Sequence, residues 1–147
     1  MNDTPPSART LLLAKEELDR TPGPDFCREL SVRYDDYFSA RLGEIDIPRK
    51  PFAVVAVGGY GRSELCARSD IDAIILYAKR VPDEAKELAK ALFFPLWDLG
   101  ADLGHGVRST DECLKLSRKD WQVFASLLDA RFLCGDKSVF DDFVRLR

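Results

Sequence analysis

The sequence predicts an α+β fold, in which a small mixed sheet is flanked by helices. Two apolar runs, at residues 52–57 and 71–77, are short and uninterrupted, as in buried strands. Residues 25–42 and 82–99 instead carry apolar side chains every three or four positions, which is typical of helices packed on one face. At 147 residues the chain suits one compact domain with an accessory helical arm.

The first 50 residues are expected to form this N-terminal helical arm. Residues 8–20 have a helical pattern, and the proline- and glycine-rich segment at 21–24 ends it. A second helix is expected over residues 25–42, with an apolar residue at every fourth position. We expect this apolar stripe to pack on the main domain, with a domain outside this sequence as the alternative. Its members are Phe26, Leu30, Tyr34, Phe38 and Leu42.

Residues 51–147 are expected to form the main domain, with its C-terminal helical part cut short, because the last helical pattern continues to the chain end. Pro95 predicts a kink or break in the helix at residues 82–99. Ser109 and Glu112 match a capping box. The other predicted elements are a short helix at 62–67, a strand at 101–108, a helix opened by Ser117 and Asp120 that reaches Phe132 and ends near Gly135, and a last helix capped by Ser138.

The composition argues against several classes of protein. A formal net charge of −3 is unlike a general nucleic-acid-binding protein, which carries a basic face. The apolar runs are too short to span a bilayer, and the N-terminus lacks the layout of a secretory signal, so we expect a cytoplasmic protein without membrane contact. The four cysteines stand far apart without a C-x-x-C pair, so we expect isolated, reduced and at least half-buried thiols rather than a zinc site.

A glycine pair at the end of the first apolar run is the first candidate functional feature. Gly58 and Gly59 permit backbone angles and close ligand approach that other residues do not. Successive backbone N–H groups between a strand end and a helix start form a concavity that suits an anion such as a triphosphate. Taken alone, such a pair more often forms an ordinary turn.

Two carboxylates at the start of the second apolar run are the second feature. Asp70 and Asp72 alternate with Ile71, so both side chains project from the same face of a strand. The two charges repel each other unless a cation such as Mg²⁺, or alternatively Mn²⁺, lies between them. Two such ions can activate an attacking hydroxyl and stabilise a leaving pyrophosphate. A solvated strand edge explains an isolated D-x-D, but the nearby glycine loop favours a metal site.

The run GGYGRSEL followed by SDID closely resembles the signature of polymerase-β-like nucleotidyltransferases. More narrowly, the chain resembles the bacterial PII uridylyltransferase/uridylyl-removing family, and the similarity continues through PLWDLGADLGHGVRSTDEC and SLLDARFLCGD. It covers about residues 52–136. The resemblance implies the polymerase-β-like nucleotidyltransferase fold and transfer of UMP from UTP to a tyrosine hydroxyl of the PII nitrogen-regulatory protein, with release of pyrophosphate.

The resemblance also implies roles for individual residues. Gly58 and Gly59 belong to the triphosphate loop, and Asp70 and Asp72 are metal-binding, catalytic carboxylates. Asp102 is our choice for a third catalytic carboxylate, because the segment 101–108 is where the neighbouring strand would fall; a solvated turn aspartate is the alternative.

Three further residues are predicted to bind the nucleotide. Arg62 and Arg108 would neutralise phosphate charge, with a surface or structural ion pair as the alternative for each. Ser69 would add a hydrogen bond to phosphate or within the loop. The family more often has H-S-V-R where this chain has H-G-V-R, and we interpret His105 as structural rather than substrate-binding. Glu64 is expected to brace the glycine loop.

The uridylyl-removing family also contains an HD-type hydrolase module and ligand-sensing ACT domains. An HD site needs several histidines, and His105 is the single histidine here. We therefore expect no uridylyl-removing activity and interpret the chain as a piece of a longer protein.

Four alternative functions stay open. Two are enzymatic: a relative that uses ATP and transfers AMP, and the adenylyltransferase acting on glutamine synthetase, although the GHGVR block fits that enzyme poorly. The other two are a catalytically silent nucleotide-binding regulatory module and an interaction domain with an incidental glycine turn.

Overall fold

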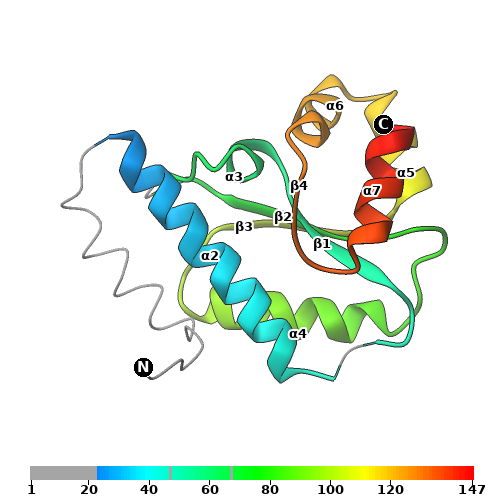
Figure 1. The fold of residues 1–147 in the computed structure, drawn as a ribbon, viewed down its shortest axis with the longest axis horizontal. Coiled ribbons are helices and arrows are strands. Elements are labelled where there is room, and N and C mark those ends of the chain that lie inside the picture. The colour runs from blue at the N-terminus through cyan, green and yellow to red at the C-terminus, as the bar shows by residue number, and fades with distance from the viewer. Residues whose placement is uncertain (1–22, 47, 67) are drawn as a thin grey trace.

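The computed structural model describes residues 23–46, 48–66 and 68–147. At its centre is a four-stranded mixed sheet with the strand order β3-β2-β1-β4 (Figure 1). β1 pairs antiparallel with both β2 and β4, whereas β2 and β3 are parallel. The predicted α+β class is therefore confirmed. The strands are β1 (Phe52–Ala56), β2 (Ile71–Tyr77), β3 (Leu103–Ser109) and β4 (Arg131–Gly135).

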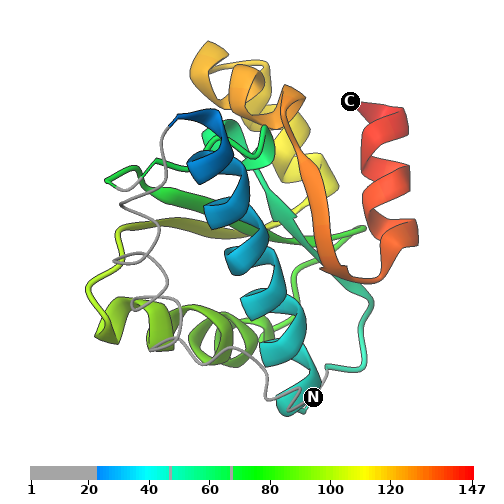
Figure 2. The same ribbon diagram turned by 60° about the vertical axis from the view of Figure 1, so that its left-hand side comes forward.

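Helices cover both faces of the sheet (Figures 1 and 2). One face packs against α2 (Pro24–Glu44) and α4 (Ala85–Asp98), and the opposite face packs against α5 (Thr110–Ser117), α6 (Trp121–Leu128) and α7 (Lys137–Leu146). Successive strand side chains alternate between the two cores because side chains in a strand point to opposite faces. A short helix, α3 (Gly58–Gly61), follows β1.

The long helix α2 packs on the sheet as expected. All five members of the predicted stripe are buried, and Phe38 has no exposed surface. The hydroxyl of Tyr37 donates a hydrogen bond to the carbonyl of Leu92 in α4 at 2.9 Å, which ties the two helices together. The predicted packing of the stripe on the main domain is thus confirmed, whereas the predicted helix at residues 8–20 lies outside the described residues.

Two sequence signals within the helices had different outcomes. The break that Pro95 was expected to allow is absent, because α4 contains this proline and continues to Asp98. The capping box at the start of α5 is present, because the Ser109 hydroxyl accepts a hydrogen bond from the Glu112 amide and the Glu112 carboxylate accepts one from the Ser109 amide.

The predicted helix at residues 62–67 was wrong. The helical turn occupies Gly58–Gly61 instead, and Ser63 has a φ of 60°, in the left-handed region, which ends any continuation. The chain then leaves as an irregular loop whose Leu65 side chain is buried in the core. The short helix therefore lies directly on the glycine motif rather than after it.

The predicted helix reaching Phe132 was also wrong. α6 ends at Leu128, and residues 131–135 form β4 because β1 offers an unpaired edge to which this apolar segment hydrogen-bonds. The N-caps of two helices differ from those predicted. In each case an aspartate next to the first residue of the helix accepts hydrogen bonds from the backbone amides of the first turn. Asp120 caps α6 in place of Ser117, and Asp136 caps α7 in place of Ser138.

Among the helices that the structure describes, none has the length and apolar character needed to cross a membrane.

Candidate active site

The glycine loop and the second carboxylate of the D-x-D motif meet at one end of the sheet. β1 and β2 run antiparallel, so the end of β1 lies beside the start of β2, and the Val57 amide donates to the Asp72 carbonyl at 3.0 Å. Gly58 follows with a φ of 58°, a conformation that favours glycine. A Cβ atom at Gly58 would lie 3.5 Å from Asp72 Oδ2. The structure therefore brings Gly58 and Asp72 together, as the sequence predicted.

A second glycine accommodates Asp72 from the other side. Asp72 pairs with Gly104 in the parallel register between β2 and β3. A Cβ atom built on Gly104 would overlap Asp72 Oδ1 and would approach Asp72 Cγ to 3.1 Å. The carboxylate can occupy this position only because Gly104 has no side chain. The sequence predicts a glycine-rich strand at 101–108 but does not indicate this role, because it does not give the cross-strand register.

The Asp72 carboxylate is held in an unfavourable electrostatic environment. Partial burial, followed by the negative charge of Asp70, raises the pKa of Asp72 above its usual value. Asp70 itself is exposed at the strand entrance. A cation between the two carboxylates would relieve this repulsion.

Replacing Asp72 with asparagine is expected to stabilise the protein in EDTA at pH 7. A carboxyl group with a raised native pKa favours the folded state below its unfolded pKa, and this contribution is lost as pH rises through the native pKa. At neutral pH the charged carboxylate is therefore destabilising, and D72N should raise the Tm by roughly 2–4 °C, which corresponds to about 1 kcal/mol in a domain of this size. Calorimetry from pH 3 to 8 measures this difference.

The control for this measurement is D83N, at an exposed aspartate before α4. It should leave the Tm within about 1 °C of wild type. The gain in D72N should shrink as pH falls towards the unfolded pKa of an aspartate. A Tm equal to or below that of wild type at pH 7 would contradict the assigned repulsion.

A pocket of about 330 Å³ opens beside Asp72 on the sheet face that α6 partly covers. Arg108 reaches into it from β3, with its Nε 3.5 Å from the position of a Cβ on Gly106. Arg108 forms no ion pair with any residue that the structure describes. The guanidinium therefore remains available to an anionic ligand. The pocket is lined by Val57, Asp72, Ile74, Gly104, His105, Gly106, Arg108, Asp120, Gln122, Val123 and Ser126.

Four residues of this pocket lie on α6 or at its N-cap, and the sequence did not indicate that they belong to the site. Asp120 caps α6 through the amides of Gln122 and Val123, so part of its carboxylate is already engaged. Gln122 and Ser126 complete the wall from the next turns. Their contribution depends on α6 folding back over the sheet, which no local motif indicates.

Arg62 lies in an internal ion-pair network. Its guanidinium contacts Glu64 at 2.7 Å and Asp129 at 2.5 Å, while its side chain is 48% exposed. The observed contacts of Arg62 are therefore those of a structural ion pair, the alternative to phosphate binding. Glu64 braces the glycine loop as expected. Ser69 also makes local contacts, because its hydroxyl accepts from the Cys66 amide at 2.9 Å and donates to the Cys66 carbonyl at 3.0 Å.

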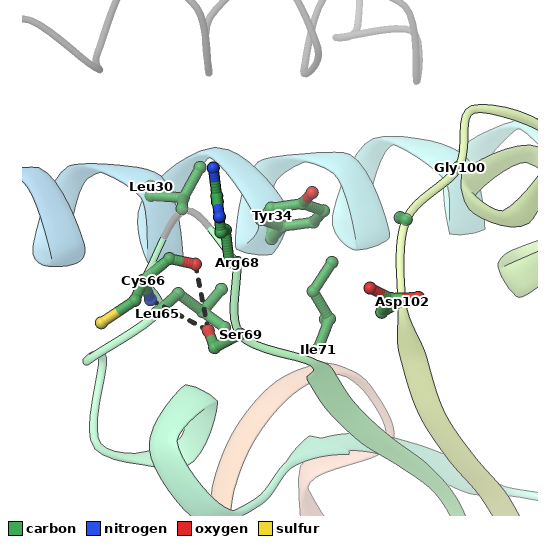
Figure 3. A pocket seen from close by; sticks show the side chains of 10 residues that line it. Leu30, Tyr34, Leu65, Cys66, Arg68, Ser69, Ile71, Gly100 and Asp102 are labelled. Atoms are coloured by element: carbon green, nitrogen blue, oxygen red, sulfur yellow. Dashed lines mark hydrogen bonds between the residues drawn. The ribbon is translucent and has the colours of Figure 1, made fainter.

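Asp102 lies in a different pocket from Asp72. The smaller pocket, of about 40 Å³, is formed between α2 and the loop before β2, and Figure 3 shows Asp102 beside Ile71 with Tyr34 close by. The Asp102 carbonyl accepts a hydrogen bond from the Ile71 amide at 2.9 Å. No three Asp, Glu, His or Cys side chains within the described parts of the chain gather closely enough to hold a metal together. The structure thus does not bring Asp102 together with Asp72.

His105 packs against aromatic side chains of α4. Its ring lies 4.6 Å from the Trp97 ring in an edge-on arrangement and 5.2 Å from the Phe93 ring. These contacts agree with the structural interpretation of this histidine, whose exposed side chain also lines the pocket beside Asp72.

A polar cluster that the sequence does not indicate holds the glycine loop in place. Arg131 of β4 contacts Asp35 of α2 at 2.6 Å and donates to the carbonyls of Tyr60 and Gly61 at 3.1 Å each. The hydroxyl of Tyr60 donates to Asp35 at 2.8 Å. The three side chains, which we call the loop latch, connect the helix, the glycine loop and β4. Tyr60 is 1% exposed, so its hydroxyl depends on this partner.

The third glycine of the GGYG run has a packing role. A Cβ atom at Gly61 would overlap the Asp129 carbonyl oxygen, so only glycine allows α3 to lie against the turn before β4.

Two comparisons with known proteins bear on this site. Residues 13–126 match the family described as "Putative nucleotidyltransferase DUF294". The chain is also 40% identical over 114 residues to the bifunctional uridylyltransferase/uridylyl-removing enzyme of Streptomyces coelicolor. That alignment covers 78% of this chain but only 14% of the relative, so the chain spans a small part of the relative's length.

Proposed function

Because the chain belongs to the DUF294 nucleotidyltransferase family, which matches most of its length, we propose that it transfers UMP from UTP to a tyrosine hydroxyl of a PII-type protein, releasing pyrophosphate. The observation that carries the proposal is the position of Asp72. Its carboxylate sits between Gly58 and Gly104, next to Asp70, at the edge of a pocket that also holds Arg108. The uridylyltransferase activity of the Streptomyces coelicolor relative supports UTP as the donor.

The donor atoms of this site fit a divalent cation. Asp70 and Asp72 supply hard oxygen ligands, and their repulsion is the electrostatic condition that a cation would relieve. We propose that these two residues hold Mg²⁺, with Mn²⁺ as a substitute. When bound, the ion would supply charge neutralisation on the phosphates and lower the pKa of the acceptor hydroxyl.

The other residues of the site have roles in binding and orientation. Gly58 and Gly59 place first-turn backbone amides, which have no acceptor within the helix, next to the carboxylates for the triphosphate. Arg108 pairs with phosphate oxygens in the pocket. We retain Asp102 as the proposed third carboxylate and Arg62 and Ser69 as proposed nucleotide contacts, which would require each to leave or share its observed partners.

The PII acceptor and the location follow from the proposed reaction. A nucleoside triphosphate donor is a cytoplasmic metabolite, which implies a cytoplasmic location for the protein. We propose neither nucleic acid nor membrane as a partner. We also expect no uridylyl-removing activity, since His105 is the single histidine of this chain and an HD-type hydrolase uses several.

The test is transfer of label from α-³²P-labelled UTP, and in parallel from labelled ATP, onto purified PII protein with Mg²⁺. Wild type should label a PII tyrosine from UTP, and the double variant D70N/D72N should lose the activity by roughly 1,000-fold or more. Addition of EDTA should abolish labelling, and Mn²⁺ should restore it in part. The exposed-aspartate variant D83N serves as the matched charge control.

The remaining outcomes distinguish the alternatives. Labelling from ATP alone would identify an adenylylating relative. Mg²⁺-dependent binding of UTP without transfer would indicate a nucleotide-binding regulatory module. Equal transfer by wild type and D70N/D72N would overturn the assignment of the site.

A further inference from the structure

Two cysteines that are 39 positions apart in the sequence lie side by side at the edge of the structure. Cys27 is on α2 and Cys66 is in the loop between the glycine motif and β2, and their sulfur atoms are 3.8 Å apart. Cys66 is exposed and Cys27 is half-buried. Four isolated, at least half-buried thiols were expected from the sequence. Both parts were wrong here, because Cys66 is exposed and the packing of α2 on the loop brings the two thiols together.

The surroundings favour the formation of a bond between the two sulfurs. Cys66 belongs to an irregular segment, so its backbone can adjust more easily than that of a helix or strand. Closing the gap from 3.8 Å to a disulfide length of about 2.05 Å requires a movement of less than about 2 Å. Figure 3 shows Cys66 at the end of the small pocket away from Asp102, with its backbone held by the Ser69 hydroxyl.

The other two cysteines provide an internal contrast. Cys113 has no exposed surface and Cys134 is 9% exposed, and both are packed in the two cores. Burial raises the pKa of Cys113 to about 11 and that of Cys134 to about 12, which disfavours the reactive thiolate. These two residues should stay reduced under mild oxidation.

We propose that Cys27 and Cys66 form a redox modification site, in which a peroxide converts the two thiols into a disulfide that links α2 to the loop preceding Asp70. The exposed Cys66 thiolate attacks one peroxide oxygen, the O–O bond breaks, and the products are a sulfenic acid and, after protonation, water. The Cys27 thiolate then attacks the Cys66 sulfur, the S–O bond breaks, and a second water leaves. The two sulfurs lose two electrons in total, and the peroxide gains them.

The order of the two steps follows from the environment of each thiol. Burial, then the hydrogen bond and charge of Cys66, and lastly the charge of Glu64, raise the pKa of the Cys27 thiol. Cys27 is also half-buried whereas Cys66 is exposed, so a peroxide reaches Cys66 first, and Cys27 is placed to resolve a sulfenic acid formed at its neighbour. The site stands whether or not the protein transfers a nucleotide, because it depends only on the packing of α2 against the loop.

The test is oxidation of the full chain with hydrogen peroxide at low micromolar protein concentration, followed by alkylation of free thiols, digestion and mass spectrometry. We expect a peptide pair joined through Cys27 and Cys66, the loss of two hydrogen atoms from the intact mass, and complete reversal by dithiothreitol. Alkylation at Cys27 and Cys66 should be lost together. Cys113 and Cys134 should become alkylated in full after denaturation.

The C27S variant separates the two steps. It should trap a sulfenic acid at Cys66, detected with dimedone, and form no internal crosslink. Wild-type protein that forms mainly dimers through Cys66, or that oxidises Cys66 to the sulfinic acid while Cys27 remains alkylatable, would overturn the proposal. A disulfide that joins either residue to Cys113 or Cys134 would overturn it as well.

Discussion

Replacing Gly104 with alanine is expected to lower nucleotidyl transfer by about 100-fold while the protein remains folded. The new Cβ would overlap the Asp72 Oδ1 atom, and the easiest adjustment is rotation of that carboxylate out of the site, because it is the free end of a side chain. A displacement of about 1 Å in a reacting group can cost two orders of magnitude in rate. The expected loss depends on the proposed role of Asp72.

The matched control is G43A, at an exposed glycine of α2 that does not line the pocket. A Cβ atom there would meet nothing within 4 Å. G43A should keep activity within about threefold of wild type, and both variants should show native circular dichroism. Equal activities of G104A and G43A would contradict the assigned role of Asp72. An unfolded G104A would contradict the expected rotation of the Asp72 side chain.

Removing the Asp35 carboxylate is expected to cost about 3 kcal/mol of stability. The D35A variant leaves Arg131 without its ion-pair partner and the Tyr60 hydroxyl without an acceptor. The side chains of Arg131 and Asp35 are 30% and 28% exposed, so the penalty falls at the lower end of the range for breaking a buried pair. Alanine has a higher intrinsic helix propensity than aspartate, so the loss cannot come from α2 itself.

Urea unfolding measures this difference, with D141A as the matched control. Asp141 pairs with Lys137 on α7, where the lysine and aspartate side chains are 67% and 51% exposed, and such surface pairs contribute little. D141A should therefore change stability by less than about 0.5 kcal/mol. If D35A and D141A unfold at the same urea concentration, the loop latch does not stabilise the fold as described.

Elements defined by local patterns were predicted well. The strand at residues 71–77 was placed with both its limits, and the capping box of Ser109 and Glu112 was identified by spacing alone. Each of these depends on neighbours within a few residues, so the chemical information is contained in a short segment. The glycine loop and D-x-D motif were identified for the same reason.

Elements that depend on distant partners were predicted poorly. Residues 129–135 carry an apolar pattern that suits either a helix or a strand, and the open edge of β1 decides between them. Asp102 and Arg108 lie in the same predicted strand segment, yet only Arg108 shares a pocket with Asp72.

The sequence by itself determined the class of fold, because each strand or helix pattern lies within a short segment. It also determined the glycine loop and the paired carboxylates Asp70 and Asp72, because adjacent residues form each motif. The tertiary structure alone decided the fit of Asp72 against Gly104, the loop latch, and the contact of Cys27 with Cys66. These features join residues between 25 and 96 positions apart, and their geometry is fixed by strand register and helix packing. Both are global properties of the buried core, which no local pattern specifies.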